Sequence, residues 1–282
     1  AGSAGCTRPA AGAVRPGHQS DVTLSSAGAH GSYLLTVPGH AVRRRPAPLI
    51  LLFYGFASDP AQFSSLTDLP ARGAAAGFLV AVPHTQPGET EFQFSGTGTD
   101  AAFVDAVVGS LESTYCVATH AVFAAGFSAG AAFTIAYSCK HESQVAAIVT
   151  VAVEFQLGCT SPLSILAFHG TEDPLVPYQN GAVGLSLPGV KVRGTELNMG
   201  DWARLDRCRG AARRTVIGTQ VVRQQWTRCT PGARVVLYTV LGGGHDWPGA
   251  DPARGVGLTT RQVSATSEAL AFFAAAVTPA RR

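Results

Sequence analysis

Short continuous runs of apolar residues recur along the chain, separated by stretches whose apolar residues have helical spacing. Continuous runs of this length are typical of strands buried on both faces of a parallel sheet. The runs cover residues 49–54, 77–82, 121–125, 145–153, 163–168 and 233–241. Helical patterns begin at about residue 69 and cover residues 99–115, 129–139 and 262–277. This alternation predicts an α/β fold with a doubly wound, mostly parallel sheet.

The beginning of the chain departs from this alternation. Residues 1–19 are rich in Gly, Ala and Pro, a composition typical of an irregular lead-in. Residues 22–26 and 32–37 then alternate between polar and apolar side chains, which predicts an antiparallel hairpin at the edge of the sheet. The pattern of buried strands begins only after this hairpin.

The alternation stops a second time between about residues 174 and 230. Within this segment, residues 195–206 have the spacing of a helix, and residues 215–227 alternate as a hairpin does. We interpret the segment as a small lobe inserted into the domain. The sequence contains no internal repeat, and we expect a single domain over residues 1–282.

The composition is that of a globular chain with a sizeable core. Of the 282 residues, 46% are hydrophobic and 14% are charged, and the net charge is +3. The arginines are scattered apart from Arg43-Arg44-Arg45 and the terminal pair, and no recognition motif accompanies them, so we expect no nucleic-acid partner. No stretch reaches the roughly 18 apolar residues that cross a bilayer. We therefore expect no membrane span, and we expect a monomer.

Cysteine usage bears on the compartment. None of the six cysteines has C-x-x-C spacing, so the sequence predicts no zinc site and no other metal centre. An even number of isolated cysteines favours three disulfides and an oxidising, extracellular location. A first residue other than Met fits a processed, secreted product. The alternative is six buried free thiols in a cytosolic protein.

One cysteine pairing follows from the predicted elements. Cys208 ends the predicted helix of residues 195–206, and Cys229 ends the hairpin-like stretch, so the excursion would return the second cysteine to the first. The other four cysteines allow several connectivities. Among them we favour Cys139 with Cys159, which leaves Cys6 for Cys116.

The residues GFSAG at 126–130 carry the first chemical signal. They separate the apolar run 121–125 from the small-residue helix 129–139, which is the context of a nucleophile elbow. In such an elbow the serine, here Ser128, occupies the apex of a tight strand-to-helix turn, and the flanking glycines allow close approach of the backbone. The alternative is a tight turn with a purely structural serine.

A serine nucleophile requires an acid and a base, which in this architecture follow later strands in the order acid, then histidine. Asp173 lies directly after the predicted strand of residues 163–168 and is the expected acid. Glu172, its neighbour, and Glu154, which follows the preceding strand, are its rivals. A surface carboxylate without a catalytic role is the alternative for Asp173.

The expected base is His245, which follows the last predicted strand after three glycines that would let the loop bend back toward the serine. His84 also follows a strand and is its main rival among the eight histidines. His169 precedes the acid in the same tight turn, and we expect it to be structural.

The motifs GFSAG, FHGTEDPLVPY and YTVLGGGHDWPG together resemble the secreted α/β-hydrolase esterases that include polyhydroxybutyrate depolymerases, feruloyl esterases and acetylxylan esterases. The resemblance extends from about residue 32 to residue 273. It implies an α/β-hydrolase fold without a cofactor. On this chain, the family's nucleophile, acid and base correspond to Ser128, Asp173 and His245. The places of the six cysteines also resemble those of the feruloyl esterase branch.

The resemblance also implies an oxyanion hole and a pocket. The backbone N–H groups of Ala129 and Phe56 are the expected oxyanion donors. Related enzymes usually carry a histidine at the position of Tyr54, so the loop at Phe56 departs from the family pattern. Tyr54, Phe127 and Trp247 are expected to border the substrate pocket, with core packing as the alternative for Trp247.

These observations predict a secreted serine esterase that works through an acyl-enzyme. Its expected substrates are feruloyl or acetyl esters of plant polysaccharide, with a polyester such as polyhydroxybutyrate as the alternative. The ester substrate is the expected partner, and it can be polymeric. Two further readings are a non-catalytic secreted binding protein on the same fold and a peptidase of similar architecture.

Overall fold

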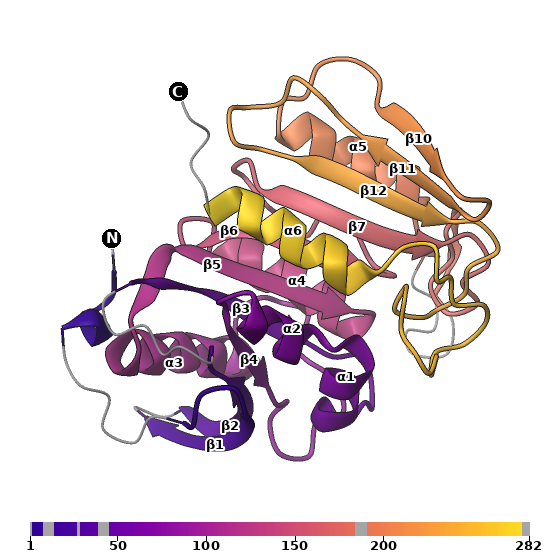
Figure 1. The fold of residues 1–282 in the computed structure, drawn as a ribbon. Coiled ribbons are helices and arrows are strands. Elements are labelled where there is room, and N and C mark those ends of the chain that lie inside the picture. Colours follow the sequence, from indigo (N-terminus) through magenta and orange to yellow (C-terminus); the bar gives the residue numbers. More distant parts are fainter. Residues whose placement is uncertain (1, 8–13, 27–28, 39–44, 184–190, 278–282) are drawn as a thin grey trace.

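A large sheet forms the centre of the molecule (Figure 1). The structure is a computed structural model that describes residues 2–7, 14–26, 29–38, 45–183 and 191–277. The sheet has ten strands in the order β1-β2-β4-β3-β5-β6-β7-β12-β11-β10. From β4 to β12 in this order the strands pair in parallel, and the outer strands on both sides pair antiparallel. This topology confirms the mostly parallel sheet that the sequence predicts.

The strands of this sheet are β1 (Gln19–Ser26), β2 (Ala29–Thr36), β3 (Ala47–Phe53), β4 (Leu79–Pro83), β5 (Val117–Phe127), β6 (Val145–Val151), β7 (Ser164–Gly170), β10 (Arg213–Ile217), β11 (Val221–Gln225) and β12 (Val235–Val240). The hairpin of β1 and β2 lies at the sheet edge, as expected. Strands β4, β7 and β12 are buried along their whole length, which explains why they appear in the sequence as continuous apolar runs.

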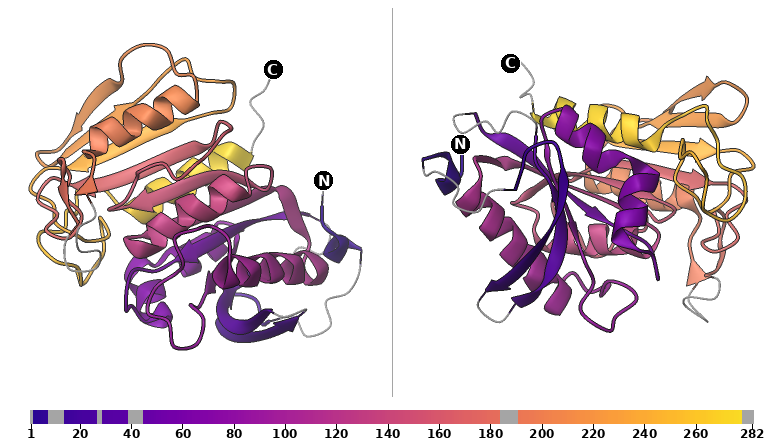
Figure 2. Two further views of the ribbon diagram at one scale, coloured as in Figure 1. Left: turned by 180° about the vertical axis from the view of Figure 1, so that it is seen from behind. Right: turned by 60° about the horizontal axis from the view of Figure 1, so that its bottom comes forward.

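Helices cover both faces of the sheet. Figure 2 shows α2 and α6 on one face and α3 and α4 on the other. Stacked rings of Phe123 in β5 and Phe273 in α6, 4.7 Å apart, join the first layer to the sheet. Phe53 in β3 and Phe133 in α4, 4.9 Å apart, join the second. The helices are η1 (Ala4–Cys6), α1 (Pro60–Thr67), α2 (Leu69–Ala75), α3 (Thr99–Thr114), α4 (Ala129–Lys140), α5 (Thr195–Leu205) and α6 (Ala265–Val277).

The segment expected as an inserted lobe has two parts. Strands β8 (Gly181–Ala182) and β9 (Lys191–Val192) form a separate two-stranded sheet, and α5 follows them. The predicted hairpin exists as β10 and β11, but it continues the central sheet because β11 pairs with β12, from Val221 opposite Val240 onward. Val221, Val222 and Gln224 of β11 are buried, whereas the first four residues of β10 are exposed.

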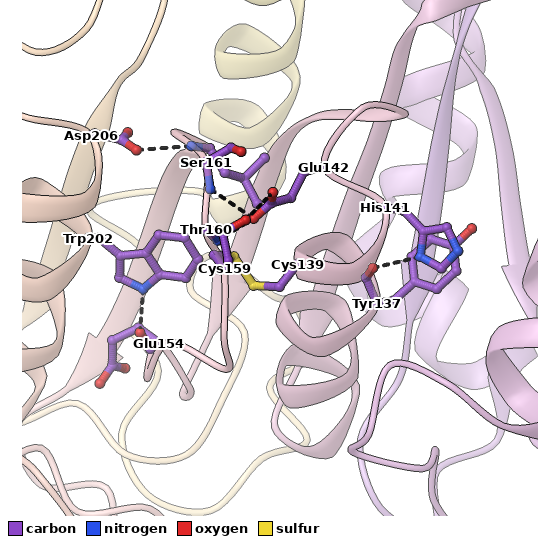
Figure 3. Close-up of a disulfide and its surroundings, with 11 residues drawn as sticks. Tyr137, Cys139, His141, Glu142, Glu154, Cys159, Thr160, Ser161, Trp202 and Asp206 are labelled. Atoms are coloured by element: carbon purple, nitrogen blue, oxygen red, sulfur yellow. Dashed lines mark hydrogen bonds between the residues drawn. A yellow bond between two sulfur atoms is a disulfide. The ribbon is translucent and has the colours of Figure 1, made fainter.

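Three disulfides tie the chain: Cys6–Cys116, Cys139–Cys159 and Cys208–Cys229. These are the pairs expected from the sequence. The Cys139–Cys159 bridge joins the end of α4 to the loop after β6 (Figure 3). Beside it, the carboxylate of Glu142 accepts hydrogen bonds from the backbone N–H groups of Thr160 and Ser161, so the same loop is anchored twice.

Two expectations from the sequence concern partners: the protein spans no membrane and binds no nucleic acid. No helix within the described residues is long and apolar enough to cross a membrane. Of the basic run at residues 43–45, Arg43 and Arg44 lie outside the described residues, as does the terminal Arg281-Arg282 pair.

Candidate active site

Ser128 occupies the turn between β5 and α4. Its backbone dihedrals, φ 54° and ψ −121°, place it in a region that residues other than glycine rarely adopt. The flanking glycines are required by contact: a Cβ at Gly126 would lie 2.3 Å from the carbonyl oxygen of Gly130, and a Cβ at Gly130 would lie 2.3 Å from that of Phe53. The sequence motif therefore has the strained geometry of a nucleophile elbow.

Asp173 and His245 form a buried hydrogen-bonded pair after β7 and β12, which are neighbouring strands. Nδ1 of His245 donates to Oδ2 of Asp173 over 2.7 Å. Oδ1 of Asp173 accepts hydrogen bonds from the backbone N–H groups of Leu175 and Val176, each at 2.8 Å. Burial alone would raise the pKa of Asp173, but the hydrogen bonds from His245 and Val176 outweigh it and hold this pKa below its ordinary value. Asp173 is therefore a fixed, ionised acceptor for His245.

Glycines bring the two loops together. A Cβ at Gly170, the last residue of β7, would lie 2.2 Å from the carbonyl oxygen of Gly243, so only glycine permits this approach. The backbone N–H of Glu172 donates to the same carbonyl over 2.9 Å. His245 itself pairs with Val256, to whose carbonyl its N–H donates over 2.7 Å. The loop after the three glycines is thus pinned on both sides.

The elbow lies beside the histidine and the loop after β3. The ring of Phe127, the residue before the serine, lies 4.8 Å from the imidazole of His245. A Cβ at Gly55 would lie 3.3 Å from the Cβ of Ser128. The carboxyl ends of β3, β5, β7 and β12 therefore converge on one site, as parallel strands allow.

The rival acids have other surroundings. The carboxylate of Glu154 contacts His169, with 2.7 Å between Oε2 and Nδ1. Glu172 is exposed. Among the described residues, the carboxylate that contacts His245 belongs to Asp173.

The rival base lies in a different environment. Nδ1 of His84 lies 2.8 Å from the hydroxyl of Ser32, a residue of the edge strand β2. Burial lowers the pKa of His84. Its ring is held by a residue of the edge hairpin, whereas His245 is held by a carboxylate.

His169 takes part in a buried network below the acid. Its Nε2 donates to the carbonyl oxygen of Val176 over 2.9 Å and lies 3.6 Å from Oδ2 of Asp173. Burial lowers the pKa of His169, but the charge of Glu154 opposes this effect and holds the pKa above its ordinary value. Both ring nitrogens face acceptors, an arrangement that favours the imidazolium form of His169. The sequence indicated a structural role for His169 but not its partner Glu154, because the two residues lie 15 positions apart, one in β7 and the other in the loop after β6.

The two expected oxyanion donors belong to the elbow and to the loop after β3. The N–H of Ala129 belongs to the first turn of α4, where no partner exists within the helix and the helix dipole is positive. Phe56 follows β3, and within the described residues its N–H donates to no backbone carbonyl. Because Gly130 lies against the carbonyls of Phe53 and Tyr54, the elbow and this loop are in direct contact.

A cavity of about 300 Å³ opens beside the serine. Its volume is at the lower end of the range for small-molecule sites, about 300–1,000 Å³. The cavity joins the serine to both expected oxyanion donors. It is lined by Phe56, Glu91, Phe94, Ser128, Ala129, Ala132, Val153, Phe155, Leu157, Val176 and Val183.

None of the three residues expected to border the pocket lines this cavity. The hydroxyl of Tyr54 is buried and accepts a hydrogen bond from the N–H of Thr85 over 2.8 Å. Phe127 packs between the rings of His245 and Phe63. Trp247 is 1% exposed, and its Nε1 donates to the hydroxyl of Thr266. This environment corresponds to core packing, the alternative for Trp247. The wall instead comes from the loops after β4 and β6, whose sequences carry no motif.

The described residues contain no group of three or more His, Cys, Asp or Glu side chains that could hold a metal ion.

In sequence comparisons the chain is similar to proteins that are named as esterases. A protein of Nocardia uniformis subsp. tsuyamanensis that is named as an esterase, NocK, is 28% identical over 83% of this chain and 76% of its own length. Feruloyl esterase B of Piromyces equi is 28% identical over 52% of this chain and 28% of its own length. No family model matches the chain. These relatives confirm the resemblance to the esterase group.

Solved structures show the same fold. An acetyl xylan esterase from Aspergillus awamori superposes with a TM-score of 0.65 at 12% identity, covering 90% of this chain and 99% of its own. An S-formylglutathione hydrolase from Agrobacterium tumefaciens gives a TM-score of 0.53 at 11% identity, covering 80% of this chain and 88% of its own. The chain has an α/β-hydrolase fold.

Proposed function

We propose that this protein is a serine esterase that hydrolyses carboxylic esters through an acyl-enzyme. The observation that carries the proposal is the buried pair of Asp173 and His245 next to an elbow whose Ser128 has a left-handed φ. An arrangement of acid, base and strained serine is characteristic of nucleophilic acyl transfer. The single chain contains all three groups, so we propose that it acts as a monomer.

In the first step, Oγ of Ser128 forms a bond to the ester carbonyl carbon while His245 accepts the hydroxyl proton. The negative charge that develops on the carbonyl oxygen is stabilised by the N–H groups of Ala129 and Phe56. The tetrahedral intermediate then releases the alcohol, which takes the proton from His245. Water then attacks the carbonyl carbon of the acyl-enzyme while His245 accepts its proton, and the carboxylic acid and free Ser128 are released.

The substrate class follows from the cavity and from the relatives. At about 30 Å³ for each water-sized group in a liquid, the cavity of about 300 Å³ has room for several such groups. The names of the relatives include feruloyl esterase, acetylxylan esterase and esterase. We propose feruloyl or acetyl esters of plant polysaccharide as substrates. A hydroxybutyrate polyester is the alternative.

Three disulfides among the six cysteines support an oxidising location, and we propose that the protein acts outside the cell.

The proposal is tested with p-nitrophenyl acetate and with a panel of methyl ferulate, acetylated xylan and hydroxybutyrate oligomers. Hydrolysis by the native protein that Ser128→Ala abolishes would support it. A folded native protein that hydrolyses none of these esters would instead favour the non-catalytic binding protein. Faster turnover of amides than of matched esters would favour the peptidase.

A further inference from the structure

Glu91 is the only ionisable side chain among the residues that line the cavity. The other lining side chains are apolar apart from the serine itself. Oε2 of Glu91 is buried, and it has no hydrogen-bond partner within the described residues. A buried polar atom without a partner is costly, so a binding site that contains one is suited to a ligand that supplies the partner.

The position of Glu91 is fixed by its neighbours on both sides. The carbonyl oxygen of Thr90 accepts a hydrogen bond from the N–H of Ala57 over 2.8 Å, which ties the Glu91 segment to the loop of the oxyanion donor Phe56. Phe92 is 1% exposed and packs against Phe53, with ring centroids 5.3 Å apart. The backbone on both sides of Glu91 is therefore held in place before any ligand arrives, which reduces the ordering cost of binding.

The cavity lies on the acyl side of the reaction. His245 must protonate the departing alcohol, so the alcohol of the ester extends toward His245. His245 does not line the cavity. Ala129 and Ala132 line the cavity. Because they are three residues apart, they lie on one face of α4, and the cavity extends along this helix from the serine. A bound ester therefore places its acyl group in the cavity.

We infer that Glu91 is a specificity-determining residue, which hydrogen-bonds a hydroxyl group on the acyl chain and makes esters of hydroxylated, aryl-sized acids the preferred substrates. The inference rests on the proposed esterase function and narrows its substrate class. An acetyl group would fill only a small part of the cavity and would leave Glu91 unpartnered.

The chemistry of Glu91 favours a hydroxyl over a charged group. Burial raises the pKa of Glu91, and the charge of Glu89 adds to this effect, so the carboxyl gains a proton more readily than an exposed one. A hydroxyl can donate to the ionised form and can also accept from the protonated form. An acyl chain that ends in a carboxylate would be repelled by the ionised form. An ammonium group would lose its hydration among apolar walls that offer it no second acceptor.

The test compares methyl 4-hydroxycinnamate with methyl 4-methoxycinnamate, which keeps the ring and blocks the hydroxyl as a donor. Binding is measured by calorimetry in the Ser128→Ala background, so that the result does not depend on turnover. We expect the hydroxylated ester to bind at least tenfold more tightly. Adding Glu91→Leu should bring the ratio of the two affinities close to one, and Glu91→Gln, which keeps an acceptor oxygen, should retain the preference.

The exposed neighbour Glu89 provides the matched control, since Glu89→Gln should leave the ratio unchanged. Circular dichroism establishes that each variant is folded. Equal affinity for the two esters with Glu91 intact, or an unchanged preference in Glu91→Leu, would overturn the inference while leaving ester hydrolysis by the native protein intact. Absence of ester hydrolysis would instead contradict the proposed function, and it is measured separately on the native protein.

Discussion

His169 and Glu154 form a buried pair below Asp173, the proposed catalytic acid, with Nδ1 2.7 Å from Oε2. The pair is further held by Asn198, whose side-chain amide donates to Oε1 of Glu154 over 2.9 Å. On its other side, His169 donates to the carbonyl of Val176, and the N–H of Val176 donates to Asp173. The pair therefore positions the turn that orients Asp173.

Glu154→Gln should destabilise the protein by about 3 kcal/mol, because removing one partner leaves the other charge buried without compensation. The effect should depend on pH. The lowered pKa of Glu154 stabilises the fold above its unfolded value of about 4.3, and this contribution is lost as the pH falls through the folded pKa. The raised pKa of His169 stabilises the fold below its unfolded value of about 6.5, and this contribution is lost as the pH rises through the folded pKa.

The measurement is urea denaturation of the native protein and of Glu154→Gln across the pH range. The difference in unfolding free energy should be greatest between about pH 4.3 and 6.5 and should decrease on either side. Glu172→Gln, at an exposed position in the same region, is the control. A difference that stays constant with pH would show that no ion pair exists.

Ser128→Ala and His245→Ala should each reduce ester turnover by at least about a thousandfold without unfolding the protein, because the members of a triad act as one unit. Asp173→Asn should be nearly as damaging, since it disfavours the tautomer that His245 requires. The measurement is kcat on p-nitrophenyl acetate. His84→Ala serves as control, and a loss of turnover there with His245→Ala active would assign the base to His84.

Asp206 should make the fold less stable as the pH rises. It is fully buried, Oδ1 accepts from the N–H of Leu163 over 2.9 Å, and Oδ2 has no partner within the described residues. Burial raises its pKa to about 7. The folded state therefore binds the proton more tightly than the unfolded chain, and stability should fall as the pH rises from about 4.

Comparing the native protein with Asp206→Asn by urea denaturation isolates this contribution. The native protein should lose stability relative to the variant between about pH 4 and 7. Parallel stability curves would contradict the assignment. Turnover of p-nitrophenyl acetate should be similar in both proteins, since Asp206 lies next to the Cys208–Cys229 bridge and not at the serine.

Replacing both Cys208 and Cys229 by alanine should cost about 3 kcal/mol of stability, as expected for a loop of this length. The two cysteines are 21 positions apart. Peptide mapping of the unreduced native protein should recover them in one linked fragment. Free thiols at both positions would contradict the pairing.

The sequence predicts the scaffold because each buried strand must be apolar on both faces. It also predicts the positions of Ser128, Asp173 and His245, because the carboxyl ends of parallel strands meet at one edge of the sheet. The order leaves Glu154, Glu172 and His84 as rivals, and the structure shows that His245 contacts Asp173. The catalytic roles of the three residues stay predictions.

The pocket was less predictable because its wall comes from loops. Glu91 and Phe155 carry no motif, and only the folded chain places them beside the serine. Trp247 illustrates the converse: the residues around it match the esterase motif, yet its indole points into the core, where Thr266 accepts its hydrogen bond. Similarly, an alternating pattern predicts a hairpin at residues 215–227 but does not say which strand the hairpin pairs with.

The bridge between Cys139 and Cys159 lies between two parts of the site that the sequence keeps apart (Figure 3). One end belongs to α4, the helix that begins at the nucleophile, and the other follows the loop whose Phe155 and Leu157 line the cavity. A chain produced in a reducing cytoplasm would keep the pair of Asp173 and His245, which follow β7 and β12, but would lack this covalent support for its cavity. Two recombinant preparations can therefore have equal activity on a small acetate ester and different activity on bulky esters. The difference depends on whether the Cys139–Cys159 disulfide has formed.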